Sequence, residues 1–476
     1  MAIGLVVSLP LGVLASPRPM ISETLLGVAG ILQTIPSLAV LVIMVPLLGV
    51  IGFAPALVAL SLYSVLPILA NTVTGLQGID PSLVEAARGL GMNARQMLRQ
   101  VQLPLAMPVI ISGVRTATVL TVGTATLATP VGALCLGNYI FSGLETNDMT
   151  ATIFGCVCTA LLAVLLDQLV RLLEVAARRR SRRHALLGAA GLAVVVAGGL
   201  YGPAANWLRG PAPVVAASNF TEQYILAAAL KAELQDAGFR IEQRDGVGNT
   251  VLFLGLKHNQ IDCAVTYSGD VWATLLKRRD VADRVTTFEL SRQYLREHYG
   301  IECLGPLGFE NSYALAMHRP RAERLGIRSI ADLAAQASGL SFAGDLAFFE
   351  RQEWGNLRDQ YGLHFKEVRP MDVSLLYAAA EEGAVDVACV YTTDARILER
   401  NLVILDDPRQ VFPPYDAMLL LSAQAAADAR FVAALRPLVR AIDVDRMRRA
   451  NLEVDVRHRS PRDAARKLLS ELSPKH

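Results

Sequence analysis

The sequence predicts an α-helical membrane half followed by an α/β half of two lobes. The chain has 476 residues, more than one ordinary domain needs. Hydrophobic residues make up 53% of it and charged residues only 18%, which is apolar for a soluble protein. The part before about Gly202 is rich in Leu, Val, Ala and Ile, whereas most of the Asp, Glu, Lys and Tyr residues follow it. Two parts of different chemistry therefore share one chain.

The first half contains apolar runs for about five to six spans. Met1–Ala15 is short and has no Lys or Arg before Arg18, so we interpret it as the end of a transmembrane helix rather than as a signal peptide. A run of about 20 residues crosses the roughly 30 Å of hydrocarbon in a bilayer. The further runs are Ser22–Val50, Ile51–Gly75, Pro108–Val131, Thr150–Leu173 and the shorter Ala185–Leu200. Pro36, Pro46 and Pro67 lie inside them, as hinges or as tolerated kinks.

A charged, helix-prone stretch, Asp80–Pro104, separates two of these runs. Its charges would be desolvated in lipid, so we expect it to protrude into water as a helical hairpin. Capping residues and helix breakers predict its two helices. The expected boundaries are Asp80-Pro81 at the first start, Gly89 and Gly91 at the break, Asn93 at the second start and Leu103-Pro104 at the second end.

Basic residues predict the orientation of the helices. The hairpin contains Arg88, Arg95 and Arg99, and a second cluster, Arg178–Arg183, follows two spans later. Because basic clusters stay on the cytoplasmic side, both belong inside the cell. The last span then places everything after Tyr201 outside.

The second half alternates strand and helix patterns after a Gly- and Pro-containing tether, Gly202–Pro213. The expected strands are VVAAS, FRIEQRD, IDCAVTY, YALAMH, LSFAGD, VDVACVY and LVIL, and the expected helices include FTEQYILAAALKAELQDAG, SIADLAAQA and SLLYAAAEEG. This alternation predicts parallel sheets with helices on both faces. The length suits two lobes with a cleft between them.

The hairpin resembles the coupling loop of ABC importer permeases. The family pattern is E-A-A, three residues, G, nine residues, I, one residue and L-P. Here it reads Glu85-Ala86-Ala87, Gly91, Val101 and Leu103-Pro104, with valine for isoleucine. The resemblance implies that this loop docks on a cytoplasmic ATPase and passes its movement to the membrane helices. The alternative is an ordinary amphipathic loop between helices.

The second half resembles the extracytoplasmic, periplasmic-binding-protein-like receptors for glycine betaine, choline, carnitine and ergothioneine. The resemblance covers nearly all of Val214–Leu472. Its markers are SNFTEQYIL, GLKHNQIDCAVTYSGD, GPLGFENSYALAM, FFERQEW, YTTDARI, VFPPYDA and NLEVDV. It implies a tyrosine cage for a trimethylammonium group, formed by Tyr267, Tyr313, Tyr391 and Tyr415, with Arg351 facing a carboxylate and with Asn219 and Asn311 as weaker contacts.

A cage of this kind suits the chemistry of a quaternary ammonium ion. A quaternary ammonium ion has no N–H to donate, whereas aromatic faces offer it negative quadrupole charge together with apolar contact. Each contact gives roughly 0.5–2 kcal/mol when desolvated, so several are needed. The alternative is that these are ordinary core or interface tyrosines.

Asp270, in TYSGD, stands where many members of the resembling family carry a threonine that helps to hold the substrate carboxylate. An added anion would repel that carboxylate, or would accept hydrogen bonds from the N–H groups of an imidazole ring. Trp272 adds a further aromatic surface. Our hypothesis is that Asp270 shifts preference from glycine betaine toward choline or ergothioneine.

Other residue patterns limit the function. The net charge of +2 gives no basic surplus for nucleic acid. No P-loop, H-E-x-x-H, G-x-S-x-G or clustered Cys/His motif occurs, and DGVGNT is interpreted as a turn. We therefore expect no catalytic residue, metal or cofactor. Cys156 and Cys158 are interpreted as packing residues, and at most one disulfide can form among Cys263, Cys303 and Cys389.

These observations predict a fused transporter subunit of the bacterial inner membrane. Its parts are a permease domain (1–177), a basic segment with the last helix (178–201), a linker (202–213) and an extracytoplasmic binding domain (214–476). By family analogy, two copies of the chain pair with a homodimeric ATPase. The alternatives are a membrane-anchored ligand sensor and, with no catalytic constellation to support it, a membrane-anchored enzyme acting on amines.

Overall fold

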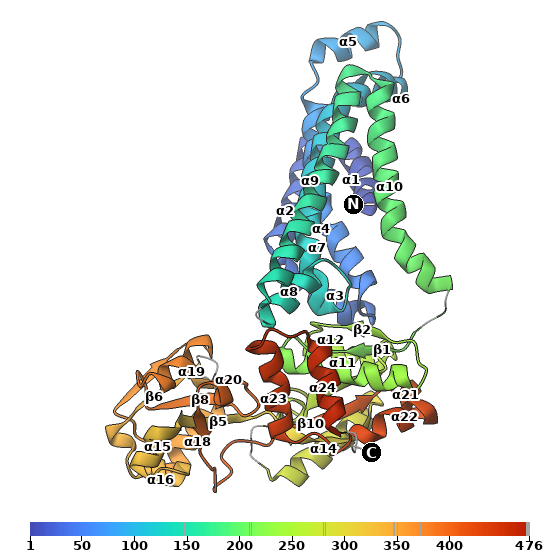
Figure 1. Cartoon of the computed structure of the whole chain (residues 1–476). Coiled ribbons are helices and arrows are strands. Elements are labelled where there is room, and N and C mark those ends of the chain that lie inside the picture. The colour runs from blue at the N-terminus through green and yellow to red at the C-terminus, as the bar shows by residue number, and fades with distance from the viewer. Residues whose placement is uncertain are drawn as a thin grey trace. The chain divides into compact units, whose positions relative to one another are not determined.

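The computed structural model describes residues 1–146, 148–208, 210, 212–278, 280, 282–345, 348–349, 351–371 and 373–472. Arg209 and Pro211 of the expected tether and Glu350 of the FFERQEW marker lie outside this set. The chain divides into two compact units (Figure 1). One comprises residues 1–144, 149–211 and 246–251, and the other residues 145–148, 212–245 and 252–476.

The first unit is helical. Its helices are α1 Ala2–Ala15, α2 Pro19–Thr34, α3 Ser37–Leu48, α4 Phe53–Gln77, α5 Pro81–Gly89, α6 Ala94–Met97, α7 Leu103–Ala125, α8 Gly137–Glu145, α9 Met149–Arg179 and α10 Arg182–Leu208. Among the described residues, four helical stretches are long and apolar enough to cross a membrane, or five if α2 and α3 form one span. α1 is a shorter apolar helix. α10 continues through the first part of the expected tether.

The run Ser22–Val50, expected as one span, is two helices bent by 94°. The break lies at Pro36, between α2 and α3, whereas Pro46 and Pro67 lie inside helices. Tyr63 on α4 donates a hydrogen bond to the carbonyl of Ile35 at the break. A neighbouring helix thus satisfies a backbone carbonyl at the break between α2 and α3, as a membrane environment requires.

The hairpin begins as the sequence predicts. The Asp80 side chain accepts a hydrogen bond of 2.9 Å from the Ser82 backbone N–H, and Pro81 opens α5. Gly91 adopts a positive φ of 76° beyond the end of α5, and Asn93 caps α6 in a capping box with Gln96.

The second end of the hairpin differs from the prediction. Leu103-Pro104 does not stop the helix, because α6 continues through a π-helical turn, Leu98–Gln102, directly into α7. The Leu103 N–H bonds to the Leu98 carbonyl five residues back. This wider turn accommodates a proline, which has no N–H to donate.

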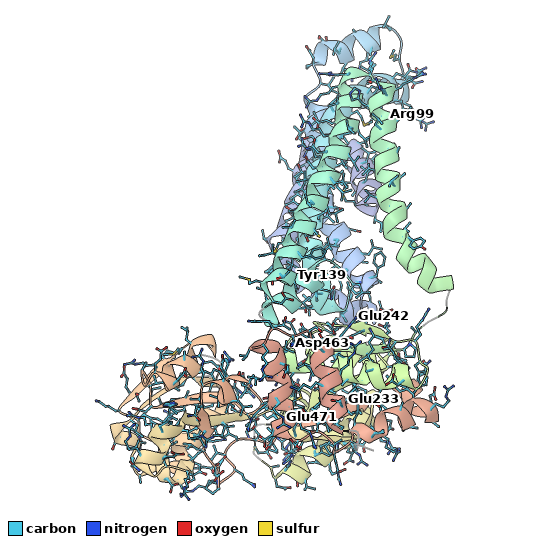
Figure 2. The ribbon with its side chains drawn as sticks, in the orientation of Figure 1. Arg99, Tyr139, Glu233, Glu242, Asp463 and Glu471 are labelled. Carbon is cyan, nitrogen blue, oxygen red and sulfur yellow. The ribbon has the colours of Figure 1, made fainter. Side chains whose placement is uncertain are left out.

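The basic clusters lie at one end of the helical unit. Figure 1 places α5, α6 and the turn between α9 and α10 together there, and Figure 2 shows Arg99 at the same end. The helices therefore bring both basic clusters to the same end of the unit, as the sequence analysis expects.

An ion pair joins two of the apolar helices and was not predicted from the sequence. Arg115 on α7 donates to both carboxylate oxygens of Asp167 on α9, at 2.9 Å for the Nη2 contact. Glu174, about two turns further along α9, lies 3.9 Å from the same guanidinium. Charges inside apolar helices are costly unless they are paired, so this pair favours one alignment of α7 and α9.

The second unit contains two five-stranded sheets. The first has the order β2-β1-β3-β10-β4 and the second β7-β6-β8-β5-β9. The first comprises β1 Val214–Ala216, β2 Glu242–Arg244, β3 Cys263–Tyr267, β4 Glu302–Glu310 and β10 Asp416–Leu421. The second comprises β5 Tyr313–His318, β6 Ser341–Gly344, β7 Glu367–Pro370, β8 Val387–Tyr391 and β9 Leu402–Ile404.

Each sheet is mixed rather than parallel. In the first, β10 runs antiparallel to β3 and β4, and in the second, β5 runs antiparallel to β8 and β9. β5 and β10 are the first strands that the chain forms after passing from one sheet to the other, so each enters its new sheet in the reverse direction. β4, β7 and β10 were not among the predicted strands.

Helices cover both sheets. They are α11 Thr221–Asp236, α12 Asn249–Lys257, α13 Ser268–Asp270, α14 Arg284–Tyr299, α15 Arg319–Leu325, α16 Ile330–Ala334, α18 Gln352–Tyr361, α19 Val373–Glu381, α20 Arg396–Glu399, α21 Ala423–Ala427, α22 Ala429–Leu435, α23 Val444–Asp455 and α24 Pro461–Leu472. Each lobe has its own apolar core, with Tyr224 and Leu419 in the first and Leu315 and Phe342 in the second. Gly238, at φ 88°, follows the end of α11 as expected.

All six cysteines are described, and all are free. Cys263 and Cys303 lie on β3 and β4, with β10 between them, and Cys389 belongs to the other sheet. Strands two places apart are separated by about 9–10 Å, too far for a disulfide.

Candidate functional site

The tyrosines predicted for the cage come from both lobes of the α/β unit. Tyr267 ends β3 and Tyr415 directly precedes β10, two strands of the first sheet. Tyr313 begins β5 and Tyr391 ends β8, two strands of the second sheet. Antiparallel pairing places Tyr313 directly opposite Tyr391. Strand ends therefore position these residues, although they are far apart in sequence.

Tyr313 and Tyr391 form one wall. Their ring centroids are 4.7 Å apart with the planes inclined at 31°, and the Tyr391 hydroxyl donates to the Tyr313 hydroxyl at 2.9 Å. Phe348 lies behind Tyr313, at 5.2 Å between centroids. Two adjacent aromatic rings on this lobe offer the negative faces that a cation prefers.

Arg351 connects the tyrosines of the two lobes. Its guanidinium carbon lies 5.3 Å from the centre of the Tyr313 ring, and its Nη2 donates a hydrogen bond to the Tyr415 hydroxyl. Its Nε also donates to Glu353 at 3.1 Å. The side chain is 37% exposed, so the guanidinium retains an accessible surface. A carboxylate is a natural additional partner for its planar donor fork.

Gly269 allows Tyr415 to lie against the backbone of α13. A Cβ atom at this glycine would lie 2.5 Å from three atoms of the Tyr415 ring. Any other residue would therefore have to move the ring. The TYSGD marker thus contains a packing requirement as well as its tyrosine.

Tyr267 has a separate environment in the first lobe. Its ring stacks on Phe220, with centroids 6.1 Å apart and the planes 29° from parallel. Its hydroxyl donates to the Glu222 carboxylate and accepts from Gln223 at 3.2 Å. The structure links Tyr313, Tyr391 and Tyr415 through Arg351 and links Tyr267 to Phe220.

The polar candidates take different positions. The Asn311 amide donates to Glu222 at 3.3 Å, and its backbone N–H donates to the Tyr415 carbonyl at 3.0 Å. Asn219 accepts from the Tyr224 hydroxyl at 2.6 Å, which ties it to the helix that follows β1. Asn311 is therefore connected to the cage residues more closely than Asn219 is.

Asp270 ends α13, one residue after Gly269. Burial raises the pKa of Asp270 to about 6, and the positive charge of Arg351 opposes this rise. The carboxyl group therefore titrates in a mildly acidic range, above which it is an anion.

A cavity of about 750 Å³ is lined by the predicted residues Asn311 and Tyr391. Its lining also includes residues to which the sequence analysis gave no role, among them Phe220, Glu222, Asn451 and Asp455. Burial raises the pKa of Asp455 to about 7, while a hydrogen bond from Thr221 opposes the rise. These residues lie within the quoted markers SNFTEQYIL, YTTDARI and NLEVDV. Their presence in these markers was the signal from which the sequence analysis could have found them.

Family comparisons identify both halves of the chain. Residues 214–471 match the family described as the substrate-binding domain of the ABC-type glycine betaine transport system. Residues 8–179 match the family described as the inner membrane component of binding-protein-dependent transport systems.

Individual relatives agree. The chain is 31% identical to an ergothioneine transport permease/ergothioneine binding protein of Helicobacter pylori, over 98% of this chain and 87% of that protein. A choline transport system permease protein of Bacillus subtilis is 45% identical over 36% of this chain and 79% of its own length. A crystal structure of a glycine betaine/carnitine/choline ABC transporter protein shares the α/β fold, with a TM-score of 0.52 at 24% identity over 54% of this chain and 98% of that chain.

We predict that Gly269→Ala destabilises the protein by about 1–3 kcal/mol, the usual result of overpacking, because the new methyl group meets the Tyr415 ring. Thermal unfolding of the purified chain measures this. Gly355→Ala is the matched control, since a Cβ there meets nothing within 4 Å. Equal melting temperatures for the two variants would contradict the prediction.

Proposed function

Because the chain belongs to the family of glycine betaine-type, binding-protein-dependent ABC import systems, with permease and substrate-binding domain in one polypeptide, we propose that it imports a quaternary ammonium compound. A separate cytoplasmic ATPase drives the import. The candidate substrates are glycine betaine, choline, carnitine and ergothioneine.

One observation in particular supports this substrate class. Tyr313 and Tyr391 from one lobe and Tyr415 from the other are joined through Arg351. Aromatic faces bind a methylated cation that has no hydrogen to donate, and a guanidinium pairs with a carboxylate in two-point contact. In this proposal Tyr267 and Phe220 complete the aromatic lining, and Asn311 and Asn219 support it.

Asp270 favours a substrate other than glycine betaine. Glycine betaine has one carboxylate beside its cationic head, and an Asp270 anion near Arg351 competes with that carboxylate for the guanidinium. Choline has no carboxylate, and ergothioneine adds an imidazole-derived ring with N–H groups. The full-length relative named as an ergothioneine transporter is in keeping with the second of these.

The hairpin supplies the contact with the ATPase. Glu85, Ala86, Ala87 and Gly91 lie in and after α5, and Leu103 and Pro104 open α7. Leu83 and Leu90 are 47% and 80% exposed, so an apolar surface flanks the charged groups of the loop. Exposed apolar side chains of this kind favour burial against a partner protein. Two copies of the chain form the pathway, with the hairpins cytoplasmic and the α/β unit extracytoplasmic in the bacterial inner membrane.

The competing function is a membrane-anchored sensor, which would bind the same amines without transport. A sensor has no need of a hairpin that docks an ATPase. Loss of ATPase binding and of transport, with ligand binding intact, separates the two functions.

We predict that Tyr313→Ala weakens ligand binding about ten-fold or more, because a desolvated cation–π contact contributes about 2 kcal/mol. Tyr313→Phe keeps the aromatic face and stays within about three-fold of the wild type. Calorimetric titration of the full chain in nanodiscs with choline, glycine betaine and ergothioneine measures this. Tyr294→Ala, on α14, is the control. Absence of binding by these three ligands and by carnitine would refute the proposed function.

Acidification should change the affinities for choline and for glycine betaine in opposite directions. Asp270, with a pKa of about 6, is an anion at pH 7.5 and mostly protonated at pH 5.5. We expect choline to bind about two- to four-fold more weakly at pH 5.5 and glycine betaine to bind more tightly. In Asp270→Asn both trends should disappear. An unchanged pH response in that variant would show that another group is responsible.

For the hairpin, we predict that Glu85→Arg abolishes capture of the co-expressed cognate ATPase and stops uptake while leaving ligand affinity unchanged. The exposed Glu85 carboxylate is replaced by a cation at the docking surface. Glu23→Arg, at an exposed position of α2, is the control. Normal ATPase capture by Glu85→Arg would favour the sensor.

A further inference from the structure

Glu222 is a buried carboxylate that the cage does not explain. It lies in the first turn of α11 and is only 3% exposed. The amide groups at a helix N-terminus favour a negative charge, but burial opposes ionisation and raises the pKa of this carboxyl group. A carboxylate buried to this extent requires hydrogen-bond donors.

Four side chains donate to it, and they come from four separate segments. They are the Tyr267 hydroxyl, the Asn311 amide at 3.3 Å, the Asn451 amide at 3.1 Å and the Thr393 hydroxyl. Tyr267 ends β3 and Asn451 belongs to α23, both in the first lobe. Asn311 and Thr393 belong to segments beside the second lobe.

The first of those segments passes from one lobe to the other, as a hinge does, and the second lies beside it within the second lobe. Asn311 lies where the chain passes from β4 in the first sheet to β5 in the second. Thr392 runs beside it: its N–H donates to the Ser312 carbonyl at 2.9 Å, and its hydroxyl accepts from the Ser312 N–H at 3.1 Å. Two residues after Asn311 comes Tyr313, and two residues before Thr393 comes Tyr391. A rotation of one lobe against the other must therefore move both segments relative to Glu222.

The side-chain amides of Asn311 and Asn451 are oriented toward Glu222, and the Asn451 amide also donates to the Thr393 carbonyl at 2.9 Å. Asn311 and Asn451 both direct their NH₂ groups to the carboxylate, and both leave a buried amide oxygen without a hydrogen-bond partner. A buried acceptor without a partner is costly. Hydrogen bonds to a charged acceptor are about twice as strong as neutral ones, which offsets that cost.

We propose that Glu222 is a positioning residue that ties the cage residue Tyr267 to the hinge segment at Asn311 and to Thr393 of the second lobe, and so couples occupation of the cage to closure of the lobes. It acts through its donors, by holding Tyr267, Asn311 and Thr393 in place. This inference depends on the proposed function only in that the cleft binds a quaternary amine.

The test is Glu222→Gln in the full chain in nanodiscs. Glutamine keeps the shape but presents an NH₂ group to donors that need an acceptor. We expect affinity for the best wild-type ligand among choline, glycine betaine and ergothioneine to fall about ten-fold or more. Hydrogen exchange should rise in peptides spanning 310–313 and 391–394 and stay unchanged in the core of the first lobe.

Glu233→Gln is the matched control. Glu233 lies on the same helix, three turns further on and on nearly the same face, and is visible in Figure 2. The Glu233→Gln variant should bind ligand as the wild type does. If Glu222→Gln unfolds the protein, Thr393→Val removes one donor at small cost in shape and should show the same two changes at smaller size.

The outcomes separate the two proposals. Wild-type protein that binds none of the three probes, and does not bind carnitine, refutes the proposed function. Wild-type protein that binds a probe, with Glu222→Gln and Thr393→Val binding it equally well, overturns the role of Glu222. Weaker binding with exchange raised uniformly, including in the first-lobe core, also overturns it, because that result reports general destabilisation and not a hinge effect.

Discussion

Hydrocarbon cannot hydrate a peptide group or a charge, and the first half of the chain follows from that constraint. Helices satisfy most backbone groups internally, and at the Pro36 break Tyr63 on a neighbouring helix donates to the Ile35 carbonyl. Arg115 and Asp167 pair with one another between α7 and α9. The hairpin helices α5 and α6 lie at one end of the unit (Figure 1).

In the α/β unit, recognition depends on what strand ends bring together. A single tyrosine binds a methylated cation weakly, and several must converge. Tyr313 and Tyr391 meet because β5 and β8 are antiparallel neighbours. Tyr415 reaches Arg351 because the chain returns to the first sheet just before β10. The crossing from β4 to β5 places Asn311 at Glu222, and the end of β8 places Thr393 there, so the segments that carry Tyr313 and Tyr391 also contact Glu222.

The sequence predicted local features better than connections between distant segments. Asp80, Asn93 and Gly238 cap or end helices as expected, because capping depends on a few neighbouring residues. The π-turn before Pro104 was missed because a proline is compatible with either an end or a distorted continuation. The antiparallel β10 was missed because strand direction depends on pairing across the sheet.

The sequence alone determined that a membrane half precedes an α/β half, which side chains belong to the hairpin and which tyrosines are candidates for a cage. Hydropathy, periodicity and marker spacing are local, so they can be read along the chain. Only the tertiary structure decided that Arg351 links Tyr313 to Tyr415, that Tyr267 stacks on Phe220 and that Glu222 accepts from four donors. Those contacts join residues separated by up to 229 positions, and such distances are closed by sheet pairing and lobe crossing.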